Sequence, residues 1–261
     1  MTVRVTTLKG PNAGVYYVDG LPNYYLDAEG EPPGVWHGRG AEVLGPGAAL
    51  VDGDFLAVMA GTNPHTGRLL GRSFDERSVR GFDVTASAPK SVSVLWALGD
   101  AHVRSEVVEA HDAAVGAMIS WMETHAHTRY RIAGQVCVVD AEGIVAGVFR
   151  QHTSRALDPQ LHSHVVSANR VLSDDGRWLA LDARTLKLDQ RSLSAIYHAG
   201  LRAELTSRLG VKWLTPVNAI AEIDGVAERV LRQFSSRTVD VEDRVDAKLA
   251  RFETKIGRAH V

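Results

Sequence analysis

Three histidines, His152, His162 and His164, form the pattern in this chain that is best suited to chemistry, with the spacing H-x9-H-x-H. The last two lie at i and i+2 in a stretch with strand character, so their side chains are expected to point to the same face. His152 ends an apolar run that begins at Ile144. If the two strands are neighbours, its imidazole can complete a cluster of three nitrogens. Such a cluster suits a divalent cation and leaves coordination positions open for a substrate.

A second H-x-H pair, His125 and His127, lies in a different context. It follows apolar residues spaced at three and four between 103 and 122, which is the pattern of an amphipathic helix. Residues at i and i+2 of a helix lie on different faces. We therefore expect this pair to be solvated residues at a helix end and not a metal site.

Two tyrosine pairs stand near the amino terminus, Tyr16-Tyr17 and Tyr24-Tyr25. Taken alone, each pair is typical of tyrosines at the edge of a core. A phenolate can also attack phosphorus and form a covalent phosphotyrosine, but its pKa near ~10 requires help from a base or a metal. A cation held by histidines would polarise the phosphate and neutralise developing charge, so each motif gives the other a role.

Asp83 lies within an apolar strand, where an unpaired carboxylate is rarely tolerated. It could orient a metal-bound histidine, accept the tyrosine proton, or simply bind local backbone. Ser87 and Lys90 follow at the expected start of a helix, with Ser87 as N-cap and Pro89 in the first turn. Phosphate binding is easy at a helix start, but for these two residues taken alone capping and solvation are favoured over contact with substrate.

The composition is that of a globular protein: 261 residues, 45% hydrophobic, 23% charged and a formal net charge of −2. Any surface for nucleic acid must therefore be a local groove, since the chain as a whole is not basic. No apolar run approaches the ~18 residues that span a bilayer. The single cysteine, Cys137, excludes an intrachain disulfide and is expected to be a buried thiol. The cytoplasm is the expected compartment.

The expected elements alternate irregularly along the chain. Strands are predicted near residues 3–8, 80–86, 135–139, 144–151, 161–172 and 212–223, and helices near 41–44, 54–60, 102–127, 185–209, from about 228, and 243–253. Residues 140–143 predict a hairpin turn between the strands at 135–139 and 144–151. Gly210 is expected to end the helix before it. The pattern indicates an α+β fold, with an antiparallel sheet and helices packed mainly on one face.

Together these motifs resemble the conjugative relaxases of the MobF class, the TrwC/TraI type of HUH endonuclease. The tyrosine pairs, FDVTASAPKSVS at residues 82–93 and HTSRALDPQLHSH at residues 152–164 occur in the family's order with similar separations. The resemblance extends from about residue 1 to about residue 250. It implies a palm of antiparallel sheet, with helices packed beneath it and a DNA groove across it.

The same resemblance implies roles for individual residues. Tyr16 would attack the nic-site phosphate at an origin of transfer, leaving a 5′ phosphotyrosine and a free 3′ hydroxyl, and Tyr24 would serve a second strand transfer. His152, His162 and His164 would hold the cation, with Asp83 beside them. Ser87, Lys90 and Arg155 are expected contacts for DNA phosphates. The family is usually described with Mg or Mn, whereas imidazole ligands intrinsically favour Zn, Ni or Cu.

The resemblance also implies partners and a domain arrangement. Single-stranded DNA with the nic site and an adjacent hairpin is the expected substrate, together with relaxosome accessory proteins and a coupling protein, and no membrane insertion. Residues 1–254 are expected to be the relaxase domain, normally followed by a helicase. Ile256–Val261 match the translation of a common sequencing adapter, so 255–261 are interpreted as an artefactual tail.

Two alternatives use the same residues differently. A metal-dependent hydrolase or oxygenase acting on a small molecule would use the three histidines and an activated water, but would leave the tyrosine pairs without a role. A module that recognises an origin hairpin without cutting it is the second alternative. Covalent attachment of protein to an oligonucleotide would separate the relaxase from both.

Overall fold

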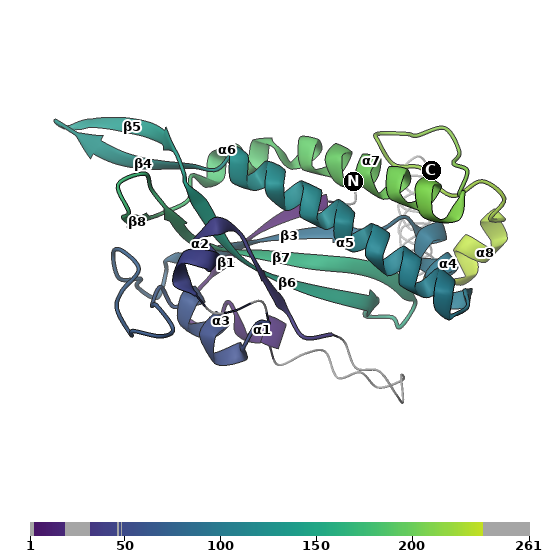
Figure 1. Cartoon of the computed structure of the whole chain (residues 1–261), viewed down its shortest axis with the longest axis horizontal. Coiled ribbons are helices and arrows are strands. Elements are labelled where there is room, and N and C mark those ends of the chain that lie inside the picture. The colour runs from purple at the N-terminus through teal and green to yellow at the C-terminus, as the bar shows by residue number, and fades with distance from the viewer. Residues whose placement is uncertain (1–2, 19–31, 46, 48, 237–261) are drawn as a thin grey trace, which may run out of the picture.

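The structure is a computed structural model that describes residues 3–18, 32–45, 47 and 49–236. A six-stranded antiparallel sheet forms its centre, in the order β1-β3-β7-β6-β2, with the short β8 pairing with β7 (Figure 1). The strands of this sheet are β1 (Val3–Lys9), β2 (Val35–His37), β3 (Val79–Ser87), β6 (Gly143–Thr153), β7 (Pro159–Leu172) and β8 (Trp178–Leu179). The predicted α+β class with an antiparallel sheet is confirmed.

The longest helices cover one face of this sheet (Figure 1). They are α4 (Lys90–Leu98), α5 (Ala101–Thr124) and α7 (Gln190–Leu209). Asp100 caps α5 by accepting a hydrogen bond from the Val103 N–H, which satisfies one of the free donors at that helix end. Gly210 ends α7 in the left-handed conformation, as predicted.

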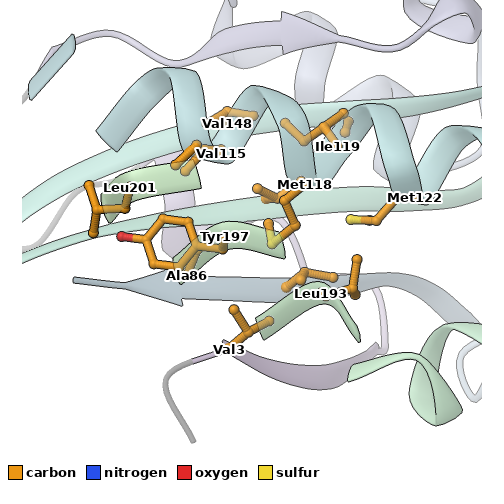
Figure 2. Packing of buried hydrophobic residues seen from close by; sticks show 14 of the residues in the cluster. Val3, Ala86, Val115, Met118, Ile119, Met122, Val148, Leu193, Tyr197 and Leu201 are labelled. Carbon is orange, nitrogen blue, oxygen red and sulfur yellow. The ribbon is translucent and has the colours of Figure 1, made fainter. Parts of the chain in front are cut away.

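The main core fills the space between this face and the helices. Figure 2 shows Met118 and Ile119 of α5 beside Leu193 and Tyr197 of α7, over Ala86 of β3. Each fully buried side chain of this size contributes roughly 1.5–3 kcal/mol through the hydrophobic effect. This packing holds the strands of the sheet in place against the long helices.

A buried polar bridge crosses this core. His111 of α5 is fully buried, and its two ring nitrogens lie 2.8 Å from the Tyr197 hydroxyl and 2.8 Å from the Ser163 hydroxyl of β7. Burial lowers the pKa of His111 to about 3, so the ring is neutral at pH 7. The bridge therefore ties both helices to the central strand without a buried charge.

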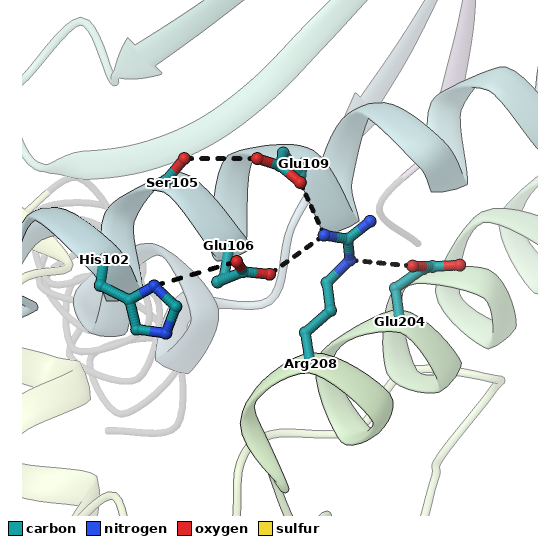
Figure 3. A network of polar contacts seen from close by, with 6 residues as sticks. All are labelled: His102, Ser105, Glu106, Glu109, Glu204 and Arg208. Atoms are coloured by element: carbon teal, nitrogen blue, oxygen red, sulfur yellow. Dashed lines mark hydrogen bonds and ion pairs between the residues drawn. The ribbon is translucent and has the colours of Figure 1, made fainter.

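A charged network joins the first turns of α5 to the last turn of α7 (Figure 3). Arg208 lies 3.0 Å from Glu106 and 2.7 Å from Glu109, both on α5, and 3.0 Å from Glu204 on its own helix. Because one guanidinium serves three carboxylates, the network holds the register of the two helices, although exposed pairs each contribute little stability.

Short helices cover the opposite face of the sheet: α1 (Val15–Val18), α2 (Arg39–Leu44) and α3 (Asp52–Met59). A second core lies beneath them, built around Phe55, Phe149 and Tyr17. Gly38 has φ 96° and lies so close to β6 that a Cβ would stand 2.4 Å from the Ile144 carbonyl oxygen. Only glycine satisfies both the backbone angle and the close approach.

The predicted hairpin between 135–139 and 144–151 is wrong. β5 (Gln135–Asp140) pairs with β4 (His127–Ile132) in a separate two-stranded sheet, whereas β6 joins the main sheet. The tight turn lies at Ala133 and Gly134, which have φ 48° and 84° and so match the right-handed twist of the strands. Cys137 lies on this hairpin and is half-buried, not in the core as expected.

Three other local predictions need correction. His125 follows the end of α5, as expected, but His127 begins β4 with its ring 3.3 Å from Asp140. Ser87 belongs to β3, and Pro89 occupies the N-cap position of α4 without a side-chain cap. Residues 212–223 form only isolated bridges and not a strand. The sequence pattern also missed β2, whose three residues are too few to show a period.

The remaining helices are α6 (Ala183–Leu188) and α8 (Glu228–Gln233), and α6 is separated from α7 at Asp189. No helix in the described residues is long and apolar enough to cross a membrane. Tyr24, Tyr25, the predicted helix at 243–253 and the predicted tail at 255–261 lie outside the described residues.

Candidate active site on the sheet

His162 and His164 lie on the sheet face that carries the short helices. Both belong to β7, two residues apart, and their ring centroids are 5.1 Å apart. His164 pairs with Phe149 of β6, whose ring stacks on Tyr17 of α1 at 5.6 Å. The predicted shared face of these two histidines is therefore present, and α1 lies directly over it.

Each of the two imidazoles has its Nδ1 atom occupied. Nδ1 of His162 lies 2.8 Å from the Gln160 carbonyl oxygen, and Nδ1 of His164 lies 2.8 Å from Oδ2 of Asp83. A carbonyl and a carboxylate accept hydrogen bonds, so Nδ1 carries the proton in both rings and Nε2 keeps its lone pair. Burial also lowers the pKa of His162 to about 4, which keeps this ring neutral at pH 7. Both Nε2 atoms are thus in the form that binds a cation.

Asp83 connects these histidines to the tyrosines. Its Oδ2 accepts a hydrogen bond from the Tyr17 hydroxyl at 3.0 Å, and its Oδ1 accepts one from the Thr85 hydroxyl at 3.2 Å. Asp83 is 7% exposed, and these contacts explain why a carboxylate is tolerated in an apolar strand. The carboxylate thus contacts a tyrosine and a histidine at once, and its recognised partners are side chains and not the local backbone.

The two described tyrosines occupy different environments. Tyr17 is buried, and burial together with the neighbouring Asp83 charge raises the pKa of its phenol well above the usual value. Tyr16 is 40% exposed, and its ring stands edge-on to His164 with centroids 6.3 Å apart. Only Tyr16 of this pair is therefore open to a substrate that approaches the histidines.

His152 does not join His162 and His164. Its ring stacks on Trp96 of α4, with centroids 4.6 Å apart and planes 5° from parallel. Within the described residues, no three His, Cys, Asp or Glu side chains are grouped closely enough to hold a metal ion. Gln151 is the β6 residue that pairs with His162. Sequence reasoning missed Gln151, although counting alternate residues from Phe149 along the strand would have found it.

The three expected phosphate contacts differ in accessibility. Ser87 pairs with His162 across β3 and β7, which places it on the histidine face. The Lys90 ammonium donates to the Pro159 carbonyl oxygen at 2.9 Å, and burial lowers its pKa. Arg155 is exposed in the turn between β6 and β7. The three surround the end of the sheet where β7 begins.

A family model described as the TrwC relaxase matches residues 10–260. The chain belongs to the TrwC relaxase family. It is 31% identical over 268 residues to the multifunctional conjugation protein TraI of Escherichia coli, and the alignment covers 96% of this chain and 15% of that protein. The chain thus spans only a small part of these relatives.

Solved structures of TrwC superpose on this relaxase along most of its length. A metal-bound complex of TrwC with oriT DNA is 32% identical, with a TM-score of 0.81, and the match covers 94% of this chain and 83% of that chain. A copper-bound complex is 33% identical, with a TM-score of 0.82 and coverage of 94% and 84%. A third, with a 27-mer DNA that comprises the recognition hairpin and the cleavage site, is 31% identical with a TM-score of 0.80, covering 94% and 83%.

Proposed function

We propose that this relaxase nicks single-stranded DNA at an origin of transfer by tyrosine transesterification and forms a 5′ phosphotyrosine. Membership of the TrwC relaxase family supports the reaction class. Its relatives include a conjugation protein and a relaxase in complex with oriT DNA, which supports the substrate class. One structural observation carries the proposal for this chain: an exposed tyrosine stands edge-on to a histidine of an aligned pair, beside a buried carboxylate.

We assign the nucleophile to Tyr16 and a positioning role to Tyr17. Tyr16 is exposed and faces His164, whereas the Tyr17 hydroxyl is engaged by Asp83 and its raised pKa opposes ionisation. In the reaction, the Tyr16 oxygen bonds to the scissile phosphorus while the bond from phosphorus to the 3′ oxygen breaks. The phenolic proton passes to solvent or a nearby base, and the 3′ oxygen departs as a hydroxyl. One phosphodiester replaces another, so nicking should be reversible.

Asp83 acts in this scheme by orientation. It holds His164 in the tautomer that presents Nε2, and it anchors Tyr17 so that α1 stays over the histidine face. Of the two active roles expected from the sequence, orientation fits these contacts better than proton abstraction, because the carboxylate oxygens are engaged by Tyr17, His164 and Thr85.

A divalent metal ion is part of the proposal, held by the Nε2 atoms of His162 and His164. The Nδ1 atoms of both rings are engaged by acceptors, which leaves Nε2 for a cation, whereas the stacking of His152 on Trp96 does not fit the predicted third ligand. When bound, the cation would polarise the scissile phosphate and offset developing charge. The related TrwC complexes with oriT DNA include a metal-bound and a copper-bound form. Mg or Mn remains the expectation from family resemblance, with Zn or Ni favoured by imidazole.

The remaining assignments follow from the same proposal. Tyr24 would serve a second strand transfer, and Ser87, Lys90 and Arg155 would contact DNA phosphates near the start of β7. Residues 1–254 would be the relaxase domain, working in the cytoplasm with accessory proteins and a coupling protein, and with a helicase domain belonging to the same protein. A nic site with an adjacent hairpin is the proposed substrate, as in the relative described with a recognition hairpin and cleavage site.

The test is covalent attachment to DNA. The protein is incubated with a library of single-stranded oligonucleotides and Mg²⁺ or Mn²⁺, and then analysed by denaturing electrophoresis. We expect a slowly migrating protein–DNA adduct in the wild type and in Tyr17→Phe, and none in Tyr16→Phe. Tyr17→Phe is the matched control because it removes the neighbouring hydroxyl on the same helix.

Other outcomes would contradict specific parts of the proposal. An adduct with Tyr16→Phe but not with Tyr17→Phe would reverse the two tyrosine roles. Cleavage that releases a free 5′ phosphate to water would exclude transesterification. Addition of a strand with a free 3′ hydroxyl should rejoin the nick, and failure to rejoin would contradict the reversible step.

A further inference from the structure

We propose that Gln151, and not His152, supplies the third protein ligand of this metal site. The inference rests on the metal binding proposed above and assigns the ligand set for this particular chain. It replaces three imidazoles by two imidazoles and one amide oxygen. The arguments come from strand register, from the environment of His152 and from the environment of Gln151.

Strand register places Gln151 on the histidine face. In the antiparallel pair of β6 and β7, Phe149 lies opposite His164 and Gln151 lies opposite His162. Residues directly opposite each other project to the same face. Phe149 confirms this direction, because its ring packs in the core under the short helices and stacks on Tyr17.

The same alternation sends His152 to the other face. Its neighbour two positions earlier, Arg150, forms an ion pair with Asp112 of α5, on the long-helix side of the sheet. His152 follows Arg150 in direction and stacks on Trp96 of α4, whose ring packs against the main core. The register shifts between Gln151 and Thr153, so the bulge occurs where the strand passes His152. The position of His152 therefore rests on its stacking with Trp96, which lies on the long-helix side of the sheet.

The side chain of Gln151 has the features of a ligand position. It is 5% exposed, yet its amide makes no hydrogen bond to any described residue. The amide is also not among the fully enclosed polar atoms of the described residues that lack a partner, so it stays open to solvent beside His162. An ion held by the Nε2 atoms of His162 and His164 would provide a partner for this amide, because amide oxygen is a normal ligand for Mg²⁺, Mn²⁺ and Ca²⁺.

This ligand set predicts a distinct metal preference. Replacing one imidazole by an amide oxygen removes a nitrogen donor that favours Ni²⁺, Cu²⁺ and Zn²⁺, and adds a hard oxygen. The site should therefore discriminate less between Mn²⁺ and Ni²⁺ than a three-histidine site would. Restoring an imidazole at position 151 should recover that discrimination.

The experiment measures metal binding directly, without DNA. Ni²⁺ and Mn²⁺ are titrated by calorimetry into the metal-free wild type and into Gln151→His, His152→Ala and His162→Ala, with His125→Ala as an exposed control. We expect Gln151→His to bind Ni²⁺ about tenfold or more tightly than the wild type, with a smaller gain for Mn²⁺. His152→Ala should stay within about twofold of the wild type, whereas His162→Ala should lose about tenfold or more. Circular dichroism checks that each variant is folded.

The contrary results are equally definite. If His152→Ala loses as much affinity as His162→Ala, or if Gln151→His gains none, His152 is the ligand and the inference is wrong. If neither the wild type nor Gln151→His binds metal, both the ligand assignment and the proposed metal fail. That failure is separate from the tyrosine chemistry, because the DNA adduct formed by Tyr16 is measured independently. A wild type that binds no metal, together with a Gln151→His variant that binds Ni²⁺, would overturn Gln151 as a ligand in this chain, although it would agree with the position of residue 151 beside His162.

Discussion

Acidification should destabilise this protein through His111, the imidazole buried between α5, α7 and β7. Burial lowers its pKa in the folded state to about 3, against ~6.5 in an unfolded chain. Between these two values the unfolded chain binds a proton that the folded protein does not. The free energy of unfolding therefore falls as the pH drops below about 6.5, and continues to fall until about 3.

The size of the effect follows from the two pKa values. Between pH 7 and pH 5, the linkage relation gives a loss of about 2 kcal/mol from His111 alone. Both ring nitrogens contact neutral hydroxyls, those of Tyr197 and Ser163, at 2.8 Å. No carboxylate contacts the ring in the described residues, so nothing nearby would compensate a buried positive charge. A loss of 2 kcal/mol is a substantial part of the total stability of a typical domain.

The assay is urea unfolding at pH 7, 6 and 5, followed by tryptophan fluorescence, with EDTA present to exclude metal binding. His111→Gln is compared with the wild type, and His102→Gln serves as the control because the His102 side chain is 73% exposed. We expect the wild type and His102→Gln to lose about 2 kcal/mol more than His111→Gln over this range. Equal losses in all three proteins would refute the reasoning, because other titrating groups are common to them.

Two further predictions concern local structure, and both are measured by urea unfolding at pH 7. Gly38→Ala should lower the free energy of unfolding by at least about 1 kcal/mol more than Gly45→Ala. Both glycines have positive φ, but only at Gly38 would the Cβ meet a carbonyl oxygen, at 2.4 Å. Equal losses would show that β6 shifts to accommodate the Cβ at little cost. Asp182→Ala should cost ~1–3 kcal/mol, because this buried carboxylate both accepts from the Arg184 N–H at the start of α6 and binds Arg129 at 2.7 Å. Asp100→Ala removes only a cap and should cost ~1 kcal/mol, so a loss as large as that of Asp182→Ala would contradict the reasoning.

The sequence by itself determined the class of fold and the main elements. The period of apolar residues located α5, and the predicted helix at 185–209 covers α7 together with part of α6, from which Asp189 separates it. The strand predicted near 161–172 located β7 with its two histidines. It also predicted that His162 and His164 share a face, because strand side chains alternate strictly. These properties are local, since each depends on a few consecutive residues and on the geometry of one element.

Local sequence patterns did not predict which strands pair with each other. The sequence offered residues 140–143 as a turn, but the chain turns at Ala133 and Gly134, and β6 pairs with β7 and β2 instead of β5. Short turns compete on small energy differences, and the burial of β6 in the main sheet, where residues 143–149 are all buried, decides the outcome. Such burial exists only once the whole sheet has formed.

The composition of the site was likewise decided by tertiary structure. The sequence placed three histidines within reach of each other, yet one residue of difference in strand position turns His152 towards Trp96 and Gln151 towards His162. The sequence also did not distinguish Tyr16 from Tyr17, which the structure separates into an exposed ring and one bound to Asp83. Residue types and spacing thus determined which chemistry was possible, whereas the direction of each side chain depended on register and on contacts between distant segments.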